Sequence, residues 1–407
     1  MIDIRPVRDE EIGPWRAAIM ETFGADPAQD PLGEERFRAL LDPTRLFGAF
    51  DRGQVVATAG GFDFQLTVPG GSVPMSGLTM VTVRPTHRRR GLLRALIAEH
   101  LAAARAHGDA ISGLWASEAT IYGRFGYGVA VEGDALTFNA TGASVRIPRA
   151  VDGGTPTADH GDRVEFASEE VAARDMPPVF ERAKRPGFFS RTPAWWRYRR
   201  VLDRPETRAN GTRRFILARR GDTPVGYLLF RQRLTWEGPG QPAGALEIEE
   251  LVAVDARAEA SLWSFVAGVD LFPRVSWPNA PTDCLLPALL DDRRRAQRRR
   301  IDSVWLRPCD LTRTLAARTY GVDDALVLGV EGETVALTSD GGVSRCESTD
   351  AAPDLVLDRP ALGAIYLGTF APSWLARTGR ISGRPEALAR ADRMFVSSAA
   401  AWCPEMF

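Results

Sequence analysis

The chain has 407 residues, of which 44% are hydrophobic and 25% charged, and its formal net charge at pH 7 is −1. A chain of this length is expected to form two or three domains, because a single hydrophobic core stops growing at a smaller size. A net charge near zero gives no general attraction to nucleic acid or to an anionic membrane. The sequence also contains no apolar run of about 18 residues, so we expect no transmembrane helix.

The cysteines and the N-terminus indicate the compartment. Four cysteines lie far apart without a CxxC pair, at Cys284, Cys309, Cys346 and Cys403. This pattern predicts neither a disulfide framework nor a structural zinc site, and we expect no bound metal. The first residues, MIDIRPVRDEEIG, lack the apolar core of a signal peptide. We therefore expect a cytoplasmic protein with free thiols.

The first part of the chain is predicted to be helical and then to form antiparallel strands. Residues 1–45 are expected to be helical, interrupted by loops. Strands are predicted at 46–50 and 54–66, because the Asp-Arg-Gly between them favours a tight turn. After a Pro-Gly-Gly turn, a third strand is predicted to end at Val83.

Three consecutive arginines at the start of an amphipathic helix are the most informative feature. The loop contains Arg88, Arg89, Arg90 and Gly91. The helix after it has apolar residues at helical spacing, namely Leu93, Leu96, Ile97, Leu101 and Ala104. Cations are unfavourable at a helix N-terminus unless an anion binds the N–H groups and the arginines together. Because glycine lets the backbone approach such an anion, we predict a pyrophosphate site; a solvated basic loop is the alternative.

The residues after this helix suggest a proton donor. A buried strand at 111–116 is followed by Ser117, a plausible cap for a short helix, and another strand is predicted at 129–139. A tyrosine, with a pKa near 10, can donate a proton to a departing thiolate, whose thiol has a pKa near 8.5. Tyr122, on the short helix, is the candidate for that role, and Tyr127 is interpreted as packing. Strands around these helices indicate a mixed α/β sheet.

The second part of the chain is a weak copy of the first. It follows residues 151–162, which are rich in Gly, Thr, Asp and Pro and are expected to form a linker. Residues 214–219 and 225–231 repeat the strand–turn–strand pattern. Residues 247–254 then repeat the third strand, and 259–269 repeat the helix. Because the copy lacks the arginines and the glycine of the loop, we expect a structural module.

The remaining residues, from about 311, are predicted to form a smaller α+β domain. The strands are expected at 325–330, 334–338 and 355–357, and the helices at 359–366 and 384–395. The chain then ends in WCPEMF, an apolar and aromatic sequence that is expected to dock, whereas most chain ends are polar and frayed. Burial would raise the pKa of the α-carboxylate of Phe407 and make it a better base toward a substrate ammonium. A tail that only packs is the alternative.

The chain resembles the Eis (enhanced intracellular survival) family of GNAT N-acetyltransferases in three motifs: VTVRPTHRRRGLLR, the serine–glutamate pair with IYGRFGYG, and the apolar end in Phe. Its loop departs from the R/Q-x-x-G-x-G/A pattern of GNAT enzymes at Leu93. The resemblance covers the whole length and implies an α/β (α+β) fold of three domains. These are a catalytic GNAT domain at 1–150, a degenerate GNAT domain at 151–305 and a sterol-carrier-protein-like α+β domain at 306–407.

The resemblance also implies the site residues. Tyr122 would be the general acid and the carboxylate of Phe407 the general base of a direct acetyl transfer from acetyl-CoA to a primary amine. The expected acetyl-CoA contacts are Val81, Thr82, Val83, Arg88, Arg89, Arg90, Gly91, Leu92, Leu93, Arg94, Ser117 and Glu118. Backbone N–H groups near 80–83 would stabilise the oxyanion. Asp26, Met80 and Glu405 are expected near the acceptor.

The acceptor and the assembly rest on the same resemblance. It implies aminoglycoside antibiotics and other polyamines as acceptors, and a homohexamer built as a trimer of dimers. A protein or peptide lysine N-acetyltransferase would use the same cofactor site with a different acceptor cleft. A CoA-sensing or lipid-carrying protein would bind acetyl-CoA without turnover, and the combination of Tyr122 with an apolar terminal carboxylate argues against it.

Three further patterns have ordinary structural explanations. His100 and His107 share a helical face, but no nearby Cys or carboxylate completes a metal site, so both are interpreted as core or boundary residues. The basic stretch 291–300, DDRRRAQRRR, is expected to be a solvated helix or loop, because two acids flank it and the chain is nearly neutral. The tryptophan-rich stretch 193–198, PAWWRY, is assigned to packing, with a pocket or an interface as the alternatives.

Overall fold

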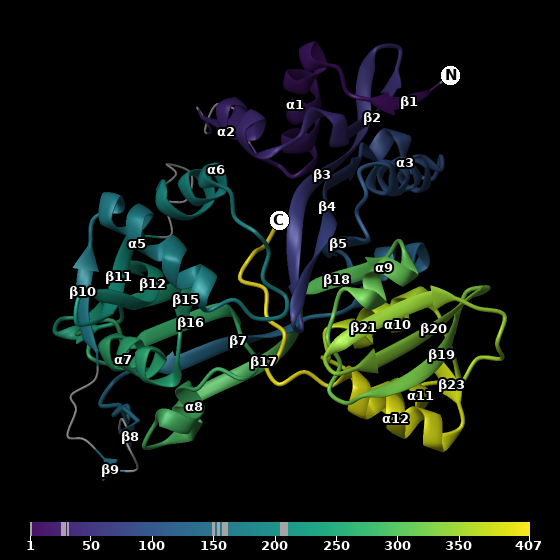
Figure 1. Ribbon diagram of the computed structural model, residues 1–407. Coiled ribbons are helices and arrows are strands. Elements are labelled where there is room, and N and C mark those ends of the chain that lie inside the picture. Colours follow the sequence, from purple (N-terminus) through teal and green to yellow (C-terminus); the bar gives the residue numbers. More distant parts are fainter. Residues whose placement is uncertain are drawn as a thin grey trace. The chain divides into compact units, whose positions relative to one another are not determined.

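The computed structural model describes residues 2–25, 30, 32–148, 151–152, 155–156, 162–203 and 211–407. These residues form two compact units (Figure 1). The first unit contains Met1–Glu132, Arg185–Arg191 and Asp302–Phe407, and the second contains Gly133–Lys184 and Thr192–Ile301.

The first unit is built on a seven-stranded sheet with the order β1-β2-β3-β4-β5-β18-β6. Its strands are β1 (Asp3–Pro6), β2 (Leu46–Asp51), β3 (Gln54–Val68), β4 (Gly71–Val83), β5 (Ile111–Trp115), β18 (Val304–Pro308) and β6 (Gly128–Val129). The predicted strands at 46–50 and 54–66 are confirmed, as is the one ending at Val83. The sequence did not predict β18, which comes from far along the chain and pairs with β5.

The helices of this part are α1 (Ile12–Thr22), α2 (Gly33–Leu40), α3 (Leu92–Ala106) and α4 (Ala119–Tyr122). The predicted amphipathic helix is α3, and its apolar positions, among them Leu96 and Ile97, pack with Leu78 and Leu114 of the sheet. The expectation that residues 1–45 are helical is wrong for β1, because those residues form an edge strand that pairs with β2.

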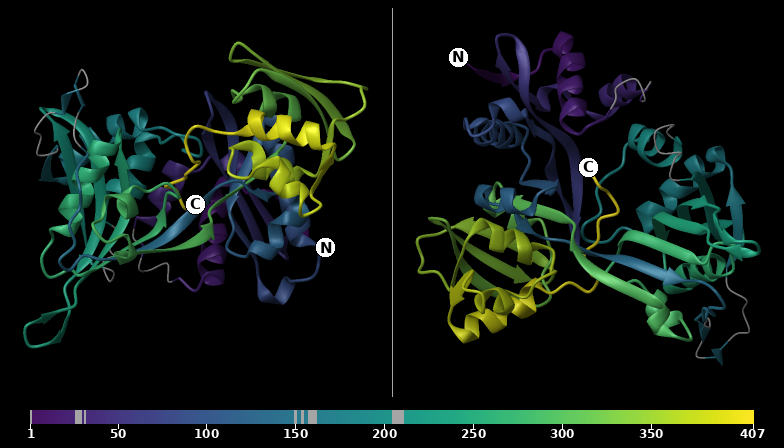
Figure 2. Two further views of the ribbon diagram at one scale, coloured as in Figure 1. Left: turned by 90° about the horizontal axis from the view of Figure 1, so that it is seen from below. Right: turned by 180° about the vertical axis from the view of Figure 1, so that it is seen from behind.

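The second unit repeats this architecture in a sheet of order β10-β11-β12-β15-β16-β7-β17. Its strands are β10 (Arg163–Ala167), β11 (Thr212–Arg220), β12 (Thr223–Arg233), β15 (Ala245–Ala253), β16 (Arg274–Ala280), β7 (Glu132–Asn139) and β17 (Ala296–Asp302). Its helices are α5 (Glu169–Arg182), α6 (Pro193–Trp195), α7 (Ala256–Ala267) and α8 (Leu286–Leu289). The repeat predicted from the sequence is therefore confirmed, with α7 following β15 as α3 follows β4. Figure 2 shows the second sheet, in teal and green, with helices packed beside it.

Each sheet takes its sixth strand from the other half of the chain. The strand predicted at 129–139 is wrong as one element, because β6 joins the first sheet and β7 the second. The chain turns between them, where the N–H groups of Ala130 and Val131 both donate to the carbonyl oxygen of Val304 (2.9 and 3.0 Å). The expected linker at 151–162 contains two short paired strands, β8 (Val151–Asp152) and β9 (Thr155–Pro156), and much of the rest of it lies outside the described residues.

The expectation that the basic stretch 291–300 is a helix or loop is wrong for its second half, which forms strand β17. Side chains two apart on a strand share a face. Arg298 and Arg300 accordingly both reach the carboxylate of Asp134, at 3.4 and 2.9 Å. Strand pairing together with these ion pairs accounts for the extended conformation. In the tryptophan-rich stretch, Trp195 and Trp196 are buried, as the packing interpretation predicted.

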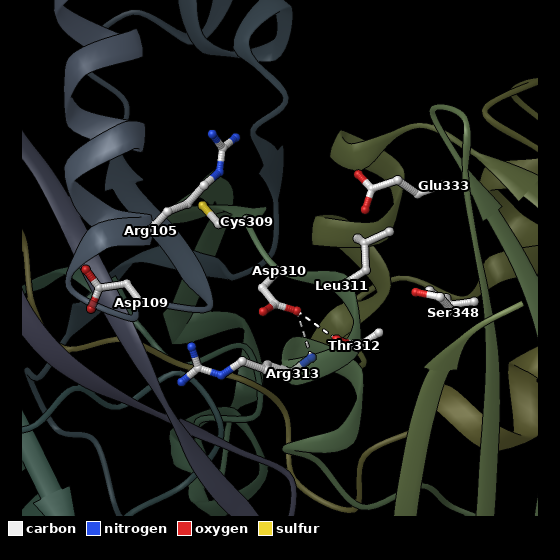
Figure 3. Close-up of a pocket in the computed structure, with 10 residues that line it drawn as sticks. Arg105, Asp109, Cys309, Asp310, Leu311, Thr312, Arg313, Glu333 and Ser348 are labelled. Atoms are coloured by element: carbon white, nitrogen blue, oxygen red, sulfur yellow. Dashed lines mark hydrogen bonds between the residues drawn. The ribbon is translucent and has the colours of Figure 1, made fainter.

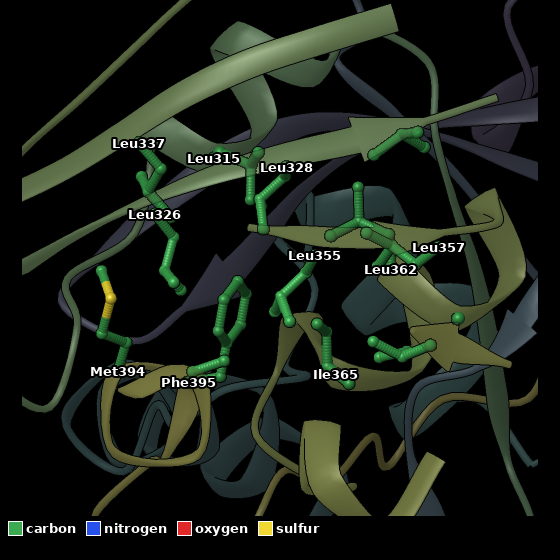
Figure 4. Close-up of a cluster of buried hydrophobic side chains, with 14 of the residues drawn as sticks. Leu315, Leu326, Leu328, Leu337, Leu355, Leu357, Leu362, Ile365, Met394 and Phe395 are labelled. Atoms are coloured by element: carbon green, nitrogen blue, oxygen red, sulfur yellow. The ribbon is translucent and has the colours of Figure 1, made fainter. Parts of the chain in front are cut away.

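The C-terminal region of the first unit has a five-stranded sheet with the order β21-β20-β19-β22-β23. Its strands are β19 (Asp324–Val330), β20 (Glu333–Asp340), β21 (Val343–Ser348), β22 (Leu355–Leu357) and β23 (Ile381–Gly383), and its helices are α9 (Leu311–Ala316), α10 (Arg359–Tyr366), α11 (Pro372–Ala376) and α12 (Pro385–Phe395). Buried side chains such as Leu328, Ile365 and Phe395 form its core (Figure 4). The strands and helices predicted here are confirmed, whereas β21, β23, α9 and α11 were not predicted.

A buried arginine joins the ends of two of these helices. Arg318 is 1% exposed, and its guanidinium donates to the carbonyl oxygens of Tyr366, the last residue of α10, and of Phe395, the last residue of α12. It also lies 4.7 Å from the ring centroid of Tyr320. A cation is favourable at a helix C-terminus, because unpaired carbonyls point there. Arg318 therefore caps two helices at once.

We expect Arg318→Met to weaken the C-terminal region by about 2–4 kcal/mol, because methionine keeps an apolar stem but leaves the buried carbonyls without their donor. Hydrogen exchange should show faster exchange of the amides of α10 and α12. The amides of α5 and α7, in the other unit, should keep their protection and serve as the control. Unchanged protection of α10 and α12 would contradict the capping role.

Candidate active site

The central feature of the first sheet is the point at which two of its strands diverge. Strands β4 and β5 are parallel and pair only between Met75–Gly77 and Ile111–Gly113. Strand β4 nevertheless continues to Val83, and β5 continues to Trp115. Beyond Gly77 the two strands are no longer paired with each other in the described register, so peptide groups of β4 become available to a ligand.

A β-bulge shapes β4 just beyond this divergence. Thr79 is opposite Gly60 and Thr82 is opposite Thr58, so β4 contains one extra residue there. Met80 takes a positive φ of 54°, which is uncommon for a residue other than glycine. The hydroxyl of Thr58 holds this conformation, lying 2.7 Å from the carbonyl oxygen of Met80 and 2.6 Å from the hydroxyl of Thr82. Bulges re-aim backbone groups beside active sites, and this one redirects the peptides of residues 80–83.

The N-terminus of α3 is open and basic, as the sequence predicted. Gly91 is its N-cap with a φ of 80°, and no side chain caps the helix or supplies an acid in its first turn. The preceding Arg88, Arg89 and Arg90 are exposed, and Arg89 also has a positive φ, of 62°. Uncapped N–H groups and arginines are the kinds of group from which proteins build anion sites. In the first turn itself Leu92 is buried, Leu93 is half-buried and Arg94 is exposed.

The corresponding helix of the second unit is closed by its own carboxylates. The side chain of Asp255 accepts a hydrogen bond from the N–H of Ala258 (2.9 Å) at the start of α7. Glu259, also in the first turn, accepts from the N–H of Leu285 (2.8 Å). Carboxylates therefore occupy this end of α7, one of them paired with Arg220, whereas the first turn of α3 has no acidic residue.

Tyr122 ends α4, the short helix that follows β5, and is 6% exposed. Burial raises its pKa above the ordinary value of 10.0, and the charge of Glu118 raises it further, whereas hydrogen bonding to Ser117 opposes the shift. The phenol is therefore protonated at neutral pH and able to donate. Ser117 is not the helix cap that we expected: Glu118 takes that position without a capping hydrogen bond. Ser117 and Glu118 are both exposed.

Tyr127 packs behind Tyr122, with ring centroids 6.2 Å apart in an edge-to-face arrangement. Its hydroxyl lies 2.7 Å from that of Ser112, which lies 3.0 Å from Nε2 of His100. Burial lowers the pKa of His100 to about 3, so the imidazole stays neutral. The interpretations of Tyr127 as packing and of His100 as a core histidine are confirmed. His107 is exposed at the end of α3, where Nδ1 lies 2.8 Å from the carbonyl oxygen of Ala103.

The C-terminal residue docks at the divergence of β4 and β5. The ring of Phe407 lies in edge-to-face contact with Phe64 and Phe189, at centroid distances of 5.3 Å in both cases. A Cβ atom on Gly77, the last residue of β4 that pairs with β5, would lie 2.7 Å from the ring of Phe64 and 3.0 Å from that of Phe407. The missing side chain at Gly77 thus makes room for both rings. The expected docking of the tail is confirmed, and the tail ends beside β3 (Figure 1).

The three residues expected near the acceptor do not form a common site in the structure. Met80 is the bulge residue and is half-buried. Glu405 is fully enclosed, with its carboxylate 2.5 Å from Nε of Arg191, so its side chain has no exposed surface to offer a substrate. Asp26 lies outside the described residues. Sequence reasoning missed Gly77, Phe189 and Arg191, because their role depends on contacts between segments far apart in the chain.

A separate pocket of about 320 Å³ lies between the end of α3 and the start of the C-terminal region (Figure 3). Its lining mixes both charges, including Arg105, Arg313, Asp310 and Glu333. The carboxylate of Asp310 already accepts hydrogen bonds from Thr312 (2.9 Å) and from the N–H of Arg313 (3.0 Å). This pocket is not lined by Tyr122 or Phe407, and we assign it no part in the chemistry.

Comparison with known families agrees with this architecture. Residues 3–130 and 187–308 each match a family described as "Acetyltransferase (GNAT) domain", and residues 311–404 match "Sterol carrier protein domain". Two GNAT folds followed by a sterol-carrier-like domain define an acyltransferase of the GNAT class.

The relatives identify the family within that class. The N-acetyltransferase Eis of Mycobacterium tuberculosis is 36% identical over 360 residues, which cover 86% of this chain and 85% of that protein. The chain belongs to the Eis family of N-acetyltransferases. An uncharacterized N-acetyltransferase of Streptomyces avermitilis is also 36% identical, covering 100% of this chain and 99% of its own. The crystal structure of Eis1 from Mycobacterium abscessus superposes with a TM-score of 0.84 at 28% identity, covering 100% of both chains.

No helix among the described residues is both long and apolar enough to cross a membrane. Within the same residues, no group of three or more His, Cys, Asp or Glu side chains is arranged to hold a metal ion.

Proposed function

We propose that this enzyme transfers the acetyl group of acetyl-CoA directly to a primary amine, at the divergence of β4 and β5. One observation carries the proposal: three candidate groups meet β4 around the divergence. The docked chain terminus lies at Gly77, whereas Leu92, at the start of the uncapped, arginine-flanked helix α3, and the buried Tyr122 share a hydrophobic cluster with Leu78. The pyrophosphate would bind to the N–H groups of α3 together with Arg88, Arg89 and Arg90. The remaining predicted contacts are Val81, Thr82, Val83, Gly91, Leu92, Leu93, Arg94, Ser117 and Glu118.

The reaction in this proposal needs no acyl-enzyme. The amine nitrogen attacks the thioester carbon, so that a C–N bond forms and the C–S bond breaks. Backbone N–H groups near the bulge at Met80 stabilise the oxyanion. The carboxylate of Phe407, directly or through a water, accepts the proton that leaves the amine, and Tyr122 donates one to the departing sulfur. Holding both reactants in place supplies much of the rate.

The acceptor class is proposed from the family resemblance. We propose aminoglycoside antibiotics or similar polyamines, with Asp26 and Met80 as acceptor-side residues predicted from the sequence. Glu405 is not among them, because its side chain is enclosed against Arg191. We further propose that the enzyme acts in the cytoplasm as a homohexamer, a trimer of dimers, without a metal, and binds neither nucleic acid nor membrane.

The test is release of the CoA thiol by the purified full chain, with acetyl-CoA and either an aminoglycoside panel or lysine peptides. Release with kanamycin-like compounds, with the acetylated product seen by mass spectrometry, would support the proposal. Release with peptides alone would assign the enzyme to protein or peptide acetylation instead. No release with any amine would overturn the proposal of amine acetylation.

The arginine loop gives a prediction of its own. We expect replacement of Arg89 and Arg90 by glutamine to raise the Kd of acetyl-CoA about tenfold or more, because two charge-assisted contacts to the pyrophosphate are lost. Isothermal titration would measure it. Replacing Arg293 and Arg294, an exposed pair in the second unit, is the matched control and should leave Kd unchanged. An unchanged Kd in the loop variant would favour a solvated loop.

A further inference from the structure

The C-terminal tail, residues 397–407, lies against a segment from the middle of the chain. That segment, Arg185–Arg191, is called the clamp here; in sequence it stands between two stretches of the second unit, yet it belongs to the first unit, as the tail does. The clamp runs beside β3. The N–H of Thr67 donates to the carbonyl oxygen of Phe188 (2.8 Å), and the N–H of Gly187 donates to the carbonyl oxygen of Thr67 (2.9 Å). The clamp is thus fixed to β3, the strand that pairs with β4.

The tail is bound to the clamp through backbone groups of the tail. The N–H of Trp402 donates to the carbonyl oxygen of Pro186 (2.9 Å), and Nε of Arg185 donates to the carbonyl oxygen of Ala400 (2.8 Å). At Gly187 the φ is +98°, and a Cβ atom there would come within 2.6 Å of the carbonyl oxygen of Trp402. Only glycine permits both this conformation and this close approach.

Two residues before the terminus, the tail forms an ion pair with the clamp. Nε of Arg191 lies 2.5 Å from the carboxylate of Glu405, and neither side chain has any exposed surface. Breaking a buried pair leaves an uncompensated charge, so such a pair holds its two segments in one arrangement. Glu405 stands only two residues before Phe407, and two residues span at most about 7 Å. The pair therefore confines the terminal carboxylate to a small volume.

We propose that Arg191 and Glu405 are positioning residues that place the carboxylate of Phe407 at the divergence of β4 and β5. The inference rests on the proposed function, in which that carboxylate is the general base. It gives Glu405 a different role from the substrate contact expected from the sequence. The phenyl ring of Phe407 packs against Phe64 and Phe189 and holds the terminal residue itself in place.

The first test is kinetic. We expect Arg191→Met to lower kcat for acetyl transfer about tenfold to a hundredfold with an unchanged Kd for acetyl-CoA, because a base displaced by about 1 Å can cost a factor of that size. Arg191→Lys keeps the charge and should restore part of the loss. In a chain that already lacks Phe407, Arg191→Met should lower kcat no further, since residues that act through one group are not additive.

The matched control is Arg359→Met. Arg359 is also a buried arginine of the first unit, with Nε 3.1 Å from the carboxylate of Glu331, and it contacts neither the tail nor the clamp in the described contacts. Its loss should lower stability while leaving kcat unchanged. An equal fall of kcat in both variants, or an additive loss in the chain without Phe407, would overturn the positioning role.

A second measurement does not depend on activity. Carboxypeptidase should release Phe407 faster from Arg191→Met than from the wild type or from Arg359→Met, as followed by the mass of the intact chain. If the wild type is active and Phe407 is released from Arg191→Met no faster than from the wild type, the inference is overturned. An inactive wild type would overturn the proposed function, and the release rate alone would then decide whether the pair holds the tail.

Discussion

Tyr122→Phe is expected to lower kcat for acetyl transfer about a hundredfold to a thousandfold while leaving the Kd of acetyl-CoA unchanged. General acid catalysis contributes a factor of this order, and the variant removes only the proton that the departing thiolate needs. Phenylalanine keeps the ring and its edge-to-face contact with Tyr127, so no cavity forms. Steady-state kinetics with a saturating amine would measure the change.

Tyr127→Phe is the matched control. It removes a neighbouring phenol whose hydroxyl is hydrogen-bonded to Ser112 and has no role in the proposed proton transfer. It should cost stability and leave kcat nearly unchanged. The pH profile gives a further check. Since burial raises the pKa of Tyr122, its protonated form persists through neutral pH, and any alkaline loss of kcat from this group should begin only above pH ~10. An equal loss in both variants would remove Tyr122 from the acid role.

Local patterns predicted the parts of the fold that depend on local interactions. The tight turn between β2 and β3, the apolar spacing of α3 and the repeat in the second unit follow from neighbouring residues, and the structure confirms them. The family, the fold class and the enzyme class predicted from the motifs are likewise confirmed by the comparisons.

Errors arose where pairing between distant segments decides the structure. The run at 129–139 has a continuous strand pattern, and nothing in it shows that its two parts join different sheets. Strand β18 enters the first sheet from beyond residue 300, and β17 is extended although its residues are mostly charged. Strand propensity reflects how well a side chain packs on a pleated surface. It therefore cannot assign a strand until the neighbouring strand is known.

The same division holds for the candidate site. The arginine loop could be recognised because it breaks a local rule at a helix N-terminus, and the open end of α3 agrees with that reasoning. The ion pair of Arg191 with Glu405 joins residues 214 positions apart, and no spacing within either segment indicates it. A terminal carboxylate with its own clamp can be recognised only once the fold has brought the two segments together.

Moving the terminal carboxylate should be as damaging as removing Tyr122. Extending the chain by one glycine after Phe407 keeps the phenyl ring but converts its carboxylate into a peptide carbonyl, which is not a base at neutral pH. We expect kcat to fall about a hundredfold or more, the contribution of a general base, with an unchanged Kd for acetyl-CoA. Deleting Phe407 should give a similar loss of kcat.

Lost packing must be separated from lost chemistry in this experiment. Phe407→Leu keeps an apolar side chain and the terminal carboxylate, so it should retain most of kcat, although its contacts with Phe64 and Phe189 are weaker. The expected order of kcat is therefore wild type, then Phe407→Leu, then the extended and the shortened chains. If the extended chain turned over as fast as Phe407→Leu, the carboxylate would have no part in proton transfer, and Phe407 would serve only to pack the tail against β3 and β4.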